Sequence, residues 1–252
     1  MAQYGFGSGS LWAVPTYTLA GVAETIPNPV PFGGLQEGHV EFSGNVKELY
    51  GQYAFPLITL PGHRKITGKS KFGQISARAV NLFFGETPAT GEIKTVNGEA
   101  GTVPTNPFKI TVTNGATWTT DLGVVFALTG LPLKRVVTPA ATGEYSVAAG
   151  GVYTFDTSDA AKAMYISYAY TAAALPGQVI TINNNLLGLA SFFKVVLNTI
   201  VQGRHMTITL NKCISNKMTF GTKSEDYVIP EFDFAAMADD GGVVGTFSLY
   251  SA

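Results

Sequence analysis

Turn-forming residues recur along the whole chain, and their density limits the elements that it can form. The 252 residues include 29 glycines and 13 prolines, about 17% of the chain against an average near 12%. Glycine favours turns and proline ends helices, so this density favours many short strands over long helices. With 46% hydrophobic and 13% charged residues, the chain has enough apolar surface to bury a core. The sequence therefore predicts a folded, mainly β protein.

The clearest strand pattern lies at residues 39–47. Val40, Phe42 and Val46 alternate there with polar residues, which is the period of a strand with one buried face. We therefore expect this apolar face to lie in the core and the opposite face to meet water. The region 56–62 that follows is rich in proline and glycine and is interpreted as turns.

One helix is predicted before Gly85. Ile75, Ala79, Leu82 and Phe83 are spaced so that they share one helical face, the pattern of a helix packed on a core. Glycine is common just after the last residue of a helix, where the backbone turns left-handed. We therefore expect a single amphipathic helix that ends at Gly85.

Residues 107–175 are predicted to form an inserted module, a small β-sandwich of the Ig-like kind. Short strand-like runs alternate there with glycine-containing turns, and junctions containing proline lie at both ends, as they do between domains. Residues 1–106 and 176–252 are then expected to form one β domain.

Within that domain, residues 1–35 are expected to be an extended N-terminal arm rather than part of a sheet. Pro27, Pro29 and Pro31 fix extended backbone and remove donors for ladder hydrogen bonds. An apolar arm needs a surface to lie on, either its own domain or a neighbouring copy.

The sequence shows no constellation of catalytic or metal-binding residues. Its three histidines do not have the spacing of metal ligands, and it contains no phosphate-binding glycine loop or nucleophile elbow. Cys213 is the only cysteine, so no disulfide forms within the chain. We therefore expect a protein that is not an enzyme, with no catalytic residue, cofactor or metal ion.

Location and nucleic-acid binding are constrained by charge and hydropathy. The first ten residues lack the basic and apolar regions of a signal peptide, and no later run is apolar enough for a membrane helix. A net charge of -1 gives no general basic field to hold nucleic acid. The chain is expected to fold in a reducing cytoplasm, without membrane insertion and without DNA binding as its main activity.

Charge is distributed in two opposite blocks. Between residues 47 and 78 there are six bases and one acid, and between residues 225 and 240 there are six acids and no base. The bases are Lys47, Arg64, Lys65, Lys69, Lys71 and Arg78, and the acids are Glu225, Asp226, Glu231, Asp233, Asp239 and Asp240. The blocks either meet within the fold, face each other between copies, or remain two solvated faces. The hypothesis taken forward is contact between copies, because complementary potentials set orientation in an assembly.

Several stretches, in this order, carry a resemblance to a known family. They are residues 7–13 (GSGSLWA), 32–36 (FGGLQ), 47–56 (KELYGQYAFP), 65–72 (KITGKSKF), 81–85 (NLFFG), 210–213 (LNKC) and 225–234 (EDYVIPEFDF). Together they span most of the chain and resemble the tail tube (major tail) proteins of tailed bacteriophages.

The resemblance implies a fold and a function. The implied fold is a tail-tube-type β-sandwich or barrel with one flanking α-helix, carrying the inserted module on the exterior. The implied function is that of a virion structural protein, assembled in the host bacterial cytoplasm, whose rings, commonly hexameric, stack into a tube for genome delivery. Implied partners are further copies of the chain and other tail proteins (terminator, baseplate or tip, tape measure, and sheath if the tail contracts), with double-stranded DNA passing transiently and non-specifically.

Contacts between subunits are expected through the arm and the loops, such as residues 5–35 and 48–64, and through the charged blocks. The candidate residues are Leu11, Trp12, Tyr50, Tyr53, Lys65, Lys69, Lys71, Arg78, Glu225, Asp226, Glu231 and Asp233.

Two alternatives stay open at this point. One is another virion component, such as a baseplate or capsid-decorating protein. The other is a carbohydrate-binding or adhesive β module in which Trp118, Tyr153, Tyr165 and Tyr170 stack on sugars, although alternating aromatic residues also fill cores.

Overall fold

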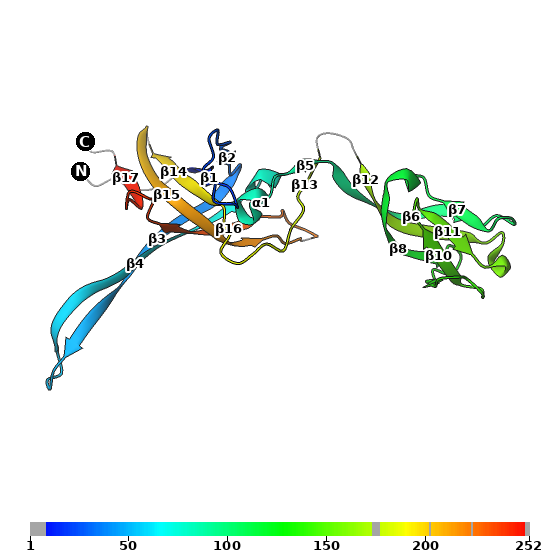
Figure 1. Cartoon of the computed structure of the whole chain (residues 1–252), viewed down its shortest axis with the longest axis horizontal. Helices are drawn as coiled ribbons and strands as arrows, with labels where there is room; N and C mark the ends of the chain where they lie inside the picture. The colour runs from blue at the N-terminus through cyan, green and yellow to red at the C-terminus, as the bar shows by residue number, and fades with distance from the viewer. Residues whose placement is uncertain (1–8, 173–176, 202, 223, 250–252) are drawn as a thin grey trace. The chain divides into compact units, whose positions relative to one another are not determined.

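The chain folds into two compact units, each mainly β (Figure 1). Unit 1 comprises Met1–Pro88 and Ile180–Ala252, and unit 2 comprises Ala89–Val179. The structure is a computed structural model, and its sheets are almost entirely antiparallel. The residues that it describes are 9–172, 177–201, 203–222 and 224–249.

Unit 1 is built on one antiparallel sheet of eight strands in the order β2-β1-β14-β15-β16-β4-β3, with β17 paired to β15. A helix, α1 (Ala77–Phe84), packs against β15. The strands are β1 (Gly9–Tyr17), β2 (Val30–Pro31), β3 (Leu35–Tyr50), β4 (Pro56–Phe72), β14 (Phe192–Val201), β15 (Arg204–Thr219), β16 (Glu231–Met237) and β17 (Gly245–Leu249).

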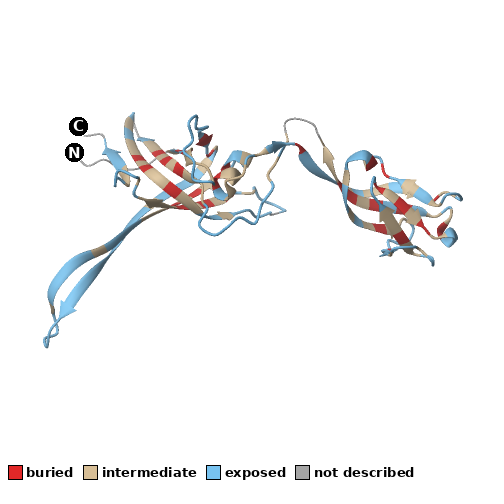
Figure 2. Cartoon of the chain, in the orientation of Figure 1, coloured by how far each residue is buried: buried red, intermediate tan, exposed pale blue. Residues whose placement is uncertain are grey.

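The core of unit 1 lies on one face of this sheet, where alternate residues point inward. Figure 2 shows the buried residues as bands that run across neighbouring strands. Phe234 is almost completely buried, and its ring lies directly over Gly68 on the neighbouring strand. A Cβ at residue 68 would collide with that ring, so only glycine lets the two strands and the aromatic ring share this space.

Helix α1 begins after Ser76 and ends before Gly85. The Ser76 side chain accepts a hydrogen bond from the Ala79 amide at 3.2 Å, and Gly85 follows the helix with φ 72° and donates its amide to Asn81. Ala79 and Leu82 are buried against the sheet. The predicted helix and its glycine terminus are confirmed, but Ile75, expected on its buried face, precedes α1 and is 52% exposed.

The expectation of an N-terminal arm is wrong for residues 9–17. These residues form β1, which pairs with β14 on one side and β2 on the other. Leu11 and Ala13 are buried, and Pro15 lies where the register with β14 shifts. A proline at such an irregularity does not disrupt the ladder, and residues 1–8 lie outside the described part of the chain.

Strands β3 and β4 form a hairpin that extends beyond the rest of the sheet (Figure 1). β16 pairs with β4 only over residues 66–71, so the outer part of the hairpin has no further strand beside it. None of residues 41–65, all of them described, is buried. The expectation that Phe42 and Val46 face the core is therefore wrong, and region 56–62 is strand rather than turns.

Unit 2 is a two-layer sandwich. One layer is the antiparallel sheet β6-β12-β8, the other is β7-β11-β10-β9, and the buried cluster between them takes residues from both. A short pair, β5 with β13, completes the unit. The strands are β5 (Ala89–Thr90), β6 (Glu92–Thr102), β7 (Lys109–Thr111), β8 (Trp118–Phe126), β9 (Lys134–Arg135), β10 (Glu144–Ala148), β11 (Val152–Phe155), β12 (Ala163–Ala172) and β13 (Gln178–Val179).

The boundary of unit 2 differs from the predicted module at 107–175. Strand β6 precedes residue 107 and pairs with β12 along most of its length, so it belongs to the sandwich. Residues 92–102 contain only two large apolar residues, Ile93 and Val96. They therefore show no strand pattern from which β6 could have been predicted.

Replacing Gly68 with alanine is expected to lower the free energy of unfolding of unit 1 by about 1–3 kcal/mol, the usual cost of overpacking a core. Gly73→Ala is the matched control, because its nearest neighbour would be 3.6 Å away. Unfolding is measured as the increase in the rate at which a thiol reagent labels Cys213, the buried and only cysteine, as urea is added. Equal urea midpoints of unfolding for both variants would show that Phe234 moves aside without cost.

Candidate self-association surface

A buried carboxylate, Asp121, lies in unit 2 among polar aromatic side chains. Its two oxygens accept hydrogen bonds from the Tyr145 hydroxyl at 2.8 Å and the Tyr153 hydroxyl at 3.0 Å. The Gly123 amide donates to it as well, and the Arg135 guanidinium lies 3.6 Å away. Burial raises the pKa of both tyrosines. Because donors of the chain itself contact both oxygens, this cluster links β8 to β10 and β11.

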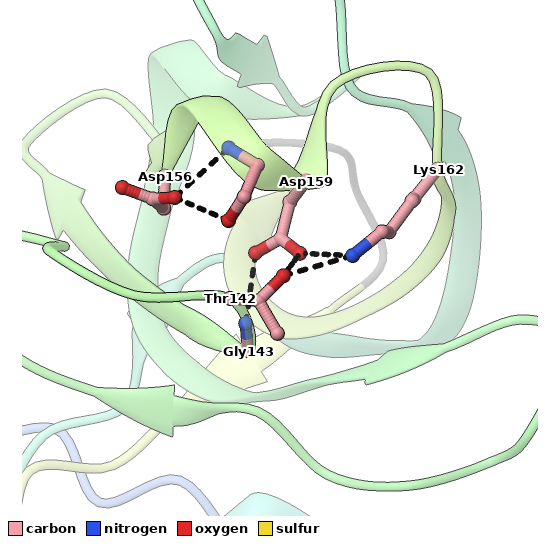
Figure 3. Close-up of polar contacts among 6 residues, drawn as sticks. Thr142, Gly143, Asp156, Asp159 and Lys162 are labelled. Carbon is pink, nitrogen blue, oxygen red and sulfur yellow. Dashed lines mark hydrogen bonds and ion pairs between the residues drawn. The ribbon is translucent and has the colours of Figure 1, made fainter.

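A second carboxylate, Asp159, joins two loops of unit 2 (Figure 3). Its oxygens accept hydrogen bonds from the Thr142 hydroxyl at 2.6 Å and the Gly143 amide at 2.9 Å, and the Lys162 ammonium lies 2.8 Å away. The Asp159 side chain is fully buried. Burial raises the pKa of Asp159, but these three donors outweigh burial and lower it. Asp159 is thus a charged structural link.

The described part of the chain contains neither a cluster of metal-ligating side chains nor a helix that could span a membrane. Among those residues no group of three or more His, Cys, Asp or Glu side chains is placed to hold a metal ion. No helix there is long and apolar enough to cross a membrane.

The most unusual surface of the molecule is the outer part of the β3–β4 hairpin. It exposes large apolar side chains on both strands and on the turn between them, with exposed fractions from 53% to 82%. Figure 2 shows this part of the chain in the exposed colour. The hairpin surface consists of Phe42, Val46, Leu49, Tyr50, Tyr53, Phe55, Leu57, Ile58 and Leu60.

Within the hairpin these side chains contact only their cross-strand neighbours. Leu49 lies opposite Ile58, and Val46 lies opposite Pro61. Such pairs contribute about 0.2–1 kcal/mol each, and an isolated two-stranded hairpin is marginally stable in water. A soluble monomer rarely keeps a contiguous apolar patch of this kind exposed, and such patches mark interaction sites.

Two sheet edges of unit 1 are also unpaired within the described residues. β3 pairs only with β4, and β17 pairs only with β15. Unpaired backbone donors and acceptors on such an edge can pair with a strand from another chain. The hairpin and these edges together make unit 1 a candidate for self-association.

The structure places three of the predicted contact residues on the outer part of the hairpin and a fourth, Trp12, elsewhere on the surface of unit 1. Tyr50 and Tyr53 belong to the hairpin surface, and Lys65 is exposed on β4. Trp12, on β1, is 42% exposed. Leu11, by contrast, is buried in the core of its own unit, so it is not available at the surface.

The charged blocks meet in part within one chain. The Lys69 ammonium lies 3.1 Å from the Glu231 carboxylate, and the Lys71 ammonium lies 2.7 Å from Glu37 and 3.9 Å from Glu231. The hydrogen bond from Lys69 lowers the pKa of Glu231. Antiparallel pairing of β4 with β16 brings these side chains side by side.

The remaining candidates are spread over unit 1. Arg78 is exposed on α1, and Glu225 and Asp226 are exposed in the loop before β16. Asp233 is half-buried on β16, and its Oδ1 atom has no hydrogen-bond partner. Whether any of them contacts another copy stays a prediction.

The sequence predicts two of the nine hairpin residues by name as contacts, Tyr50 and Tyr53, and the region 48–64 as contact loops. It does not single out Phe55, Leu57 and their neighbours, because the turn interpretation of this region hides the exposed apolar strands. A signal was present, since residues 49–60 contain no charged residue, which is unusual for an exposed segment.

The proposed sugar-stacking residues are mostly not on the surface. Tyr153 is fully buried, and Trp118 and Tyr170 pack against the core of unit 2. Only Tyr165, 42% exposed, presents much of its ring to water. The aromatic platform expected for a carbohydrate-binding module is therefore not formed by these four residues.

No model of a known protein family matches the chain, and no curated protein matches its sequence. A functional assignment therefore depends on the hairpin surface, the open sheet edges and the resemblance of the motifs.

Asp159→Ala is expected to lower the free energy of unfolding of unit 2 by about 2–3 kcal/mol, since hydrogen bonds to a charged group contribute on this scale. Asp156→Ala is the control, because Asp156 only caps the short turn Thr157–Asp159. The chain has two tryptophans, Trp12 in unit 1 and Trp118 in unit 2. In a Trp12→Phe background, fluorescence in urea therefore reports unit 2 alone.

The same carboxylate should make unit 2 acid-sensitive. Its pKa is lower in the folded state than in the unfolded state, so its contribution is present at neutral pH and is lost as the pH falls below about 4. Asp159→Ala should lack this part of the pH dependence when unfolding is measured between pH 7 and pH 3. Parallel pH profiles for the variant and the parent protein would contradict the assignment.

Proposed function

We propose that the chain is a virion structural protein, the subunit of a bacteriophage tail tube. Copies assemble into rings, hexameric in the arrangement that the resemblance implies, and the rings stack into a channel for the genome. The observation that carries the proposal is the β3–β4 hairpin, a long two-stranded ribbon that exposes nine large apolar residues. In a tube these residues are covered by neighbouring copies, which explains why the monomer leaves them open.

The energy available from this surface is sufficient for assembly. Burying one large apolar side chain contributes about 1.5–3 kcal/mol, and permanent interfaces bury roughly 2,000 Å² or more. A heterologous contact, in which two different surfaces meet, forms a ring if its rotation closes and a filament if it does not. The unpaired edges of β3 and β17 add strand pairing to this contact.

The inner surface of a channel that conducts DNA must bind DNA only weakly. The net charge is -1, and Lys69 and Lys71 are already paired with carboxylates of the same chain. Each phosphate that a protein neutralises adds salt-dependent affinity, so a surface without a basic field lets the duplex slide. In this proposal unit 2 is an Ig-like module on the outer surface of the tube.

Electron microscopy of the concentrated, purified chain tests the proposal. Rings or hollow tubes with a regular axial repeat are expected. Because assembly can depend on a tail-tip complex, the same search is made in intact phage particles with an antibody against unit 2. A monomer in solution, together with an absence of label along the tails, would contradict the proposal.

Substitution of the hairpin turn should block assembly without unfolding the chain. Tyr53→Ser combined with Phe55→Ser removes two exposed apolar side chains, and burial of both is worth at least about 3 kcal/mol. The concentration needed for assembly should therefore rise by about a hundredfold or more, as measured by sedimentation. The thermal unfolding midpoint should stay the same, because exposed substitutions change stability by about 0.5 kcal/mol or less.

The matched control carries Leu128→Ser and Val137→Ser. Both residues are 95% exposed and both lie in unit 2, so the control loses the same kind of apolar area elsewhere. It should assemble like the parent chain. An equal loss of assembly in both double variants would show that general surface hydrophobicity, rather than the hairpin, drives association.

A further inference from the structure

An uncharged groove, lined by leucine and phenylalanine residues together with asparagine and serine residues, lies between α1 and the loop 183–191 of unit 1. Its volume is about 310 Å³, at the lower end of the range for ligand-binding clefts. Leu187 is fully exposed at its rim, and Leu186 is 81% exposed. The other large apolar residues of its lining are Leu19, Leu82, Phe83, Phe84, Leu189 and Ile214.

The loop that forms one wall of this groove is held in place at both ends. The amides of Asn183 and Asn185 donate to the Glu86 carboxylate at 2.9 and 3.1 Å. At the other end, the Ser191 hydroxyl donates to the Leu82 carbonyl oxygen at 3.1 Å. The two ends of the loop are thus anchored to the end of α1 and to Glu86, while the leucines between them stay exposed.

The groove differs from three other clefts of unit 1 in its charge. The cleft beside Tyr17 is lined by lysines and aspartates, the cleft at the base of the hairpin by Arg64 and Lys65, and the cleft beside Leu35 by Glu37. No charged residue lines the α1 groove. An uncharged occupant enters such a site without leaving a charge unpaired, which would otherwise be costly.

The hairpin surface has the matching composition. Residues 49–60, which form its outer end, contain no charged residue and expose Tyr53 and Phe55 at the turn. The hairpin of the same chain does not reach this groove, because its outer end lies well away from α1 in unit 1 (Figure 1). An uncharged projection and an uncharged recess therefore occupy different places on one unit.

We propose that the outer end of the hairpin of one copy docks in the α1 groove of a second copy. This proposal rests on the self-assembly proposed above and specifies its two contacting surfaces. The contact is heterologous, so every docked copy still offers a free groove and a free hairpin to the next copies. Tyr53 or Phe55 fills the recess, and Leu186 and Leu187 close over it.

Cysteine cross-linking between two single variants tests the contact. Phe55→Cys and Leu187→Cys proteins, each the full chain, are mixed in equal amounts at the assembly concentration and treated with a mild oxidant. A disulfide requires Cα atoms within about 4.4–6.8 Å, so only docked copies become linked. The native Cys213 does not interfere, because it is fully buried and burial raises the pKa of its thiol to about 12.

A disulfide between the peptides that carry residues 55 and 187 is expected, at least tenfold more abundant than either homodimer. Leu128→Cys replaces Leu187→Cys in the control mixture, because Leu128 is equally accessible but lies in unit 2. Equal yields in the two mixtures would show random collision and overturn the contact. A predominant 55–55 disulfide would overturn it as well, because two hairpins would then meet each other.

Electron microscopy of the same mixtures separates this inference from the proposed function. Tubes without the 55–187 disulfide would overturn the groove contact and leave the tube function standing. The disulfide in short oligomers, with no tubes at any concentration and no protein in phage tails, would support the contact and overturn the function. Absence of the disulfide and of any oligomer, together with an absence of the protein from phage tails, would overturn both.

Discussion

The pairing of β4 with β16 ends at residue 66, and much of unit 1 follows from that limit. Inside it, β4 lies in a sheet whose inner face is filled by Phe234 over Gly68. Outside it, β3 and β4 have only each other, and no layer faces them. The same alternation of apolar residues therefore produces a core at one end of the strand pair and an open apolar ribbon at the other. The hairpin surface is thus formed by the parts of β3 and β4 that extend beyond the core of unit 1.

Local signals predicted the elements that depend on local chemistry. Gly85 ends the helix where its backbone preference places it. The burial of strand residues could not be predicted in the same way. Alternation of apolar and polar residues indicates a strand, but it does not show whether another layer covers the apolar face. Phe42 follows the pattern of a core residue and is 59% exposed. The proline residues of the first segment likewise concealed β1, whose pairing with β14 joins residues far apart in the sequence.

Charge patterning in the sequence predicted complementary blocks but not where they meet. Strand register decides that question, because Lys71 lies opposite Glu231 on β16 and beside Glu37 on β3. Such partly exposed pairs contribute modestly to stability, yet they cancel positive charge along the base of the hairpin. The segment beyond them carries no charge between residues 49 and 60. Because this end of the hairpin is uncharged, apolar contact is the main attraction that it offers to another copy.

The marginal stability of a two-stranded ribbon also affects the kinetics of growth. A hairpin that lacks a facing layer fluctuates in water, so a docking partner must order it as well as cover it, and this ordering reduces the free energy of the first contact. A pair of copies is then short-lived, whereas a copy that joins an existing end makes several contacts at once. For the proposed assembly we therefore expect a high nucleation barrier and rapid elongation, so that copies stay separate until a template supplies the first ring.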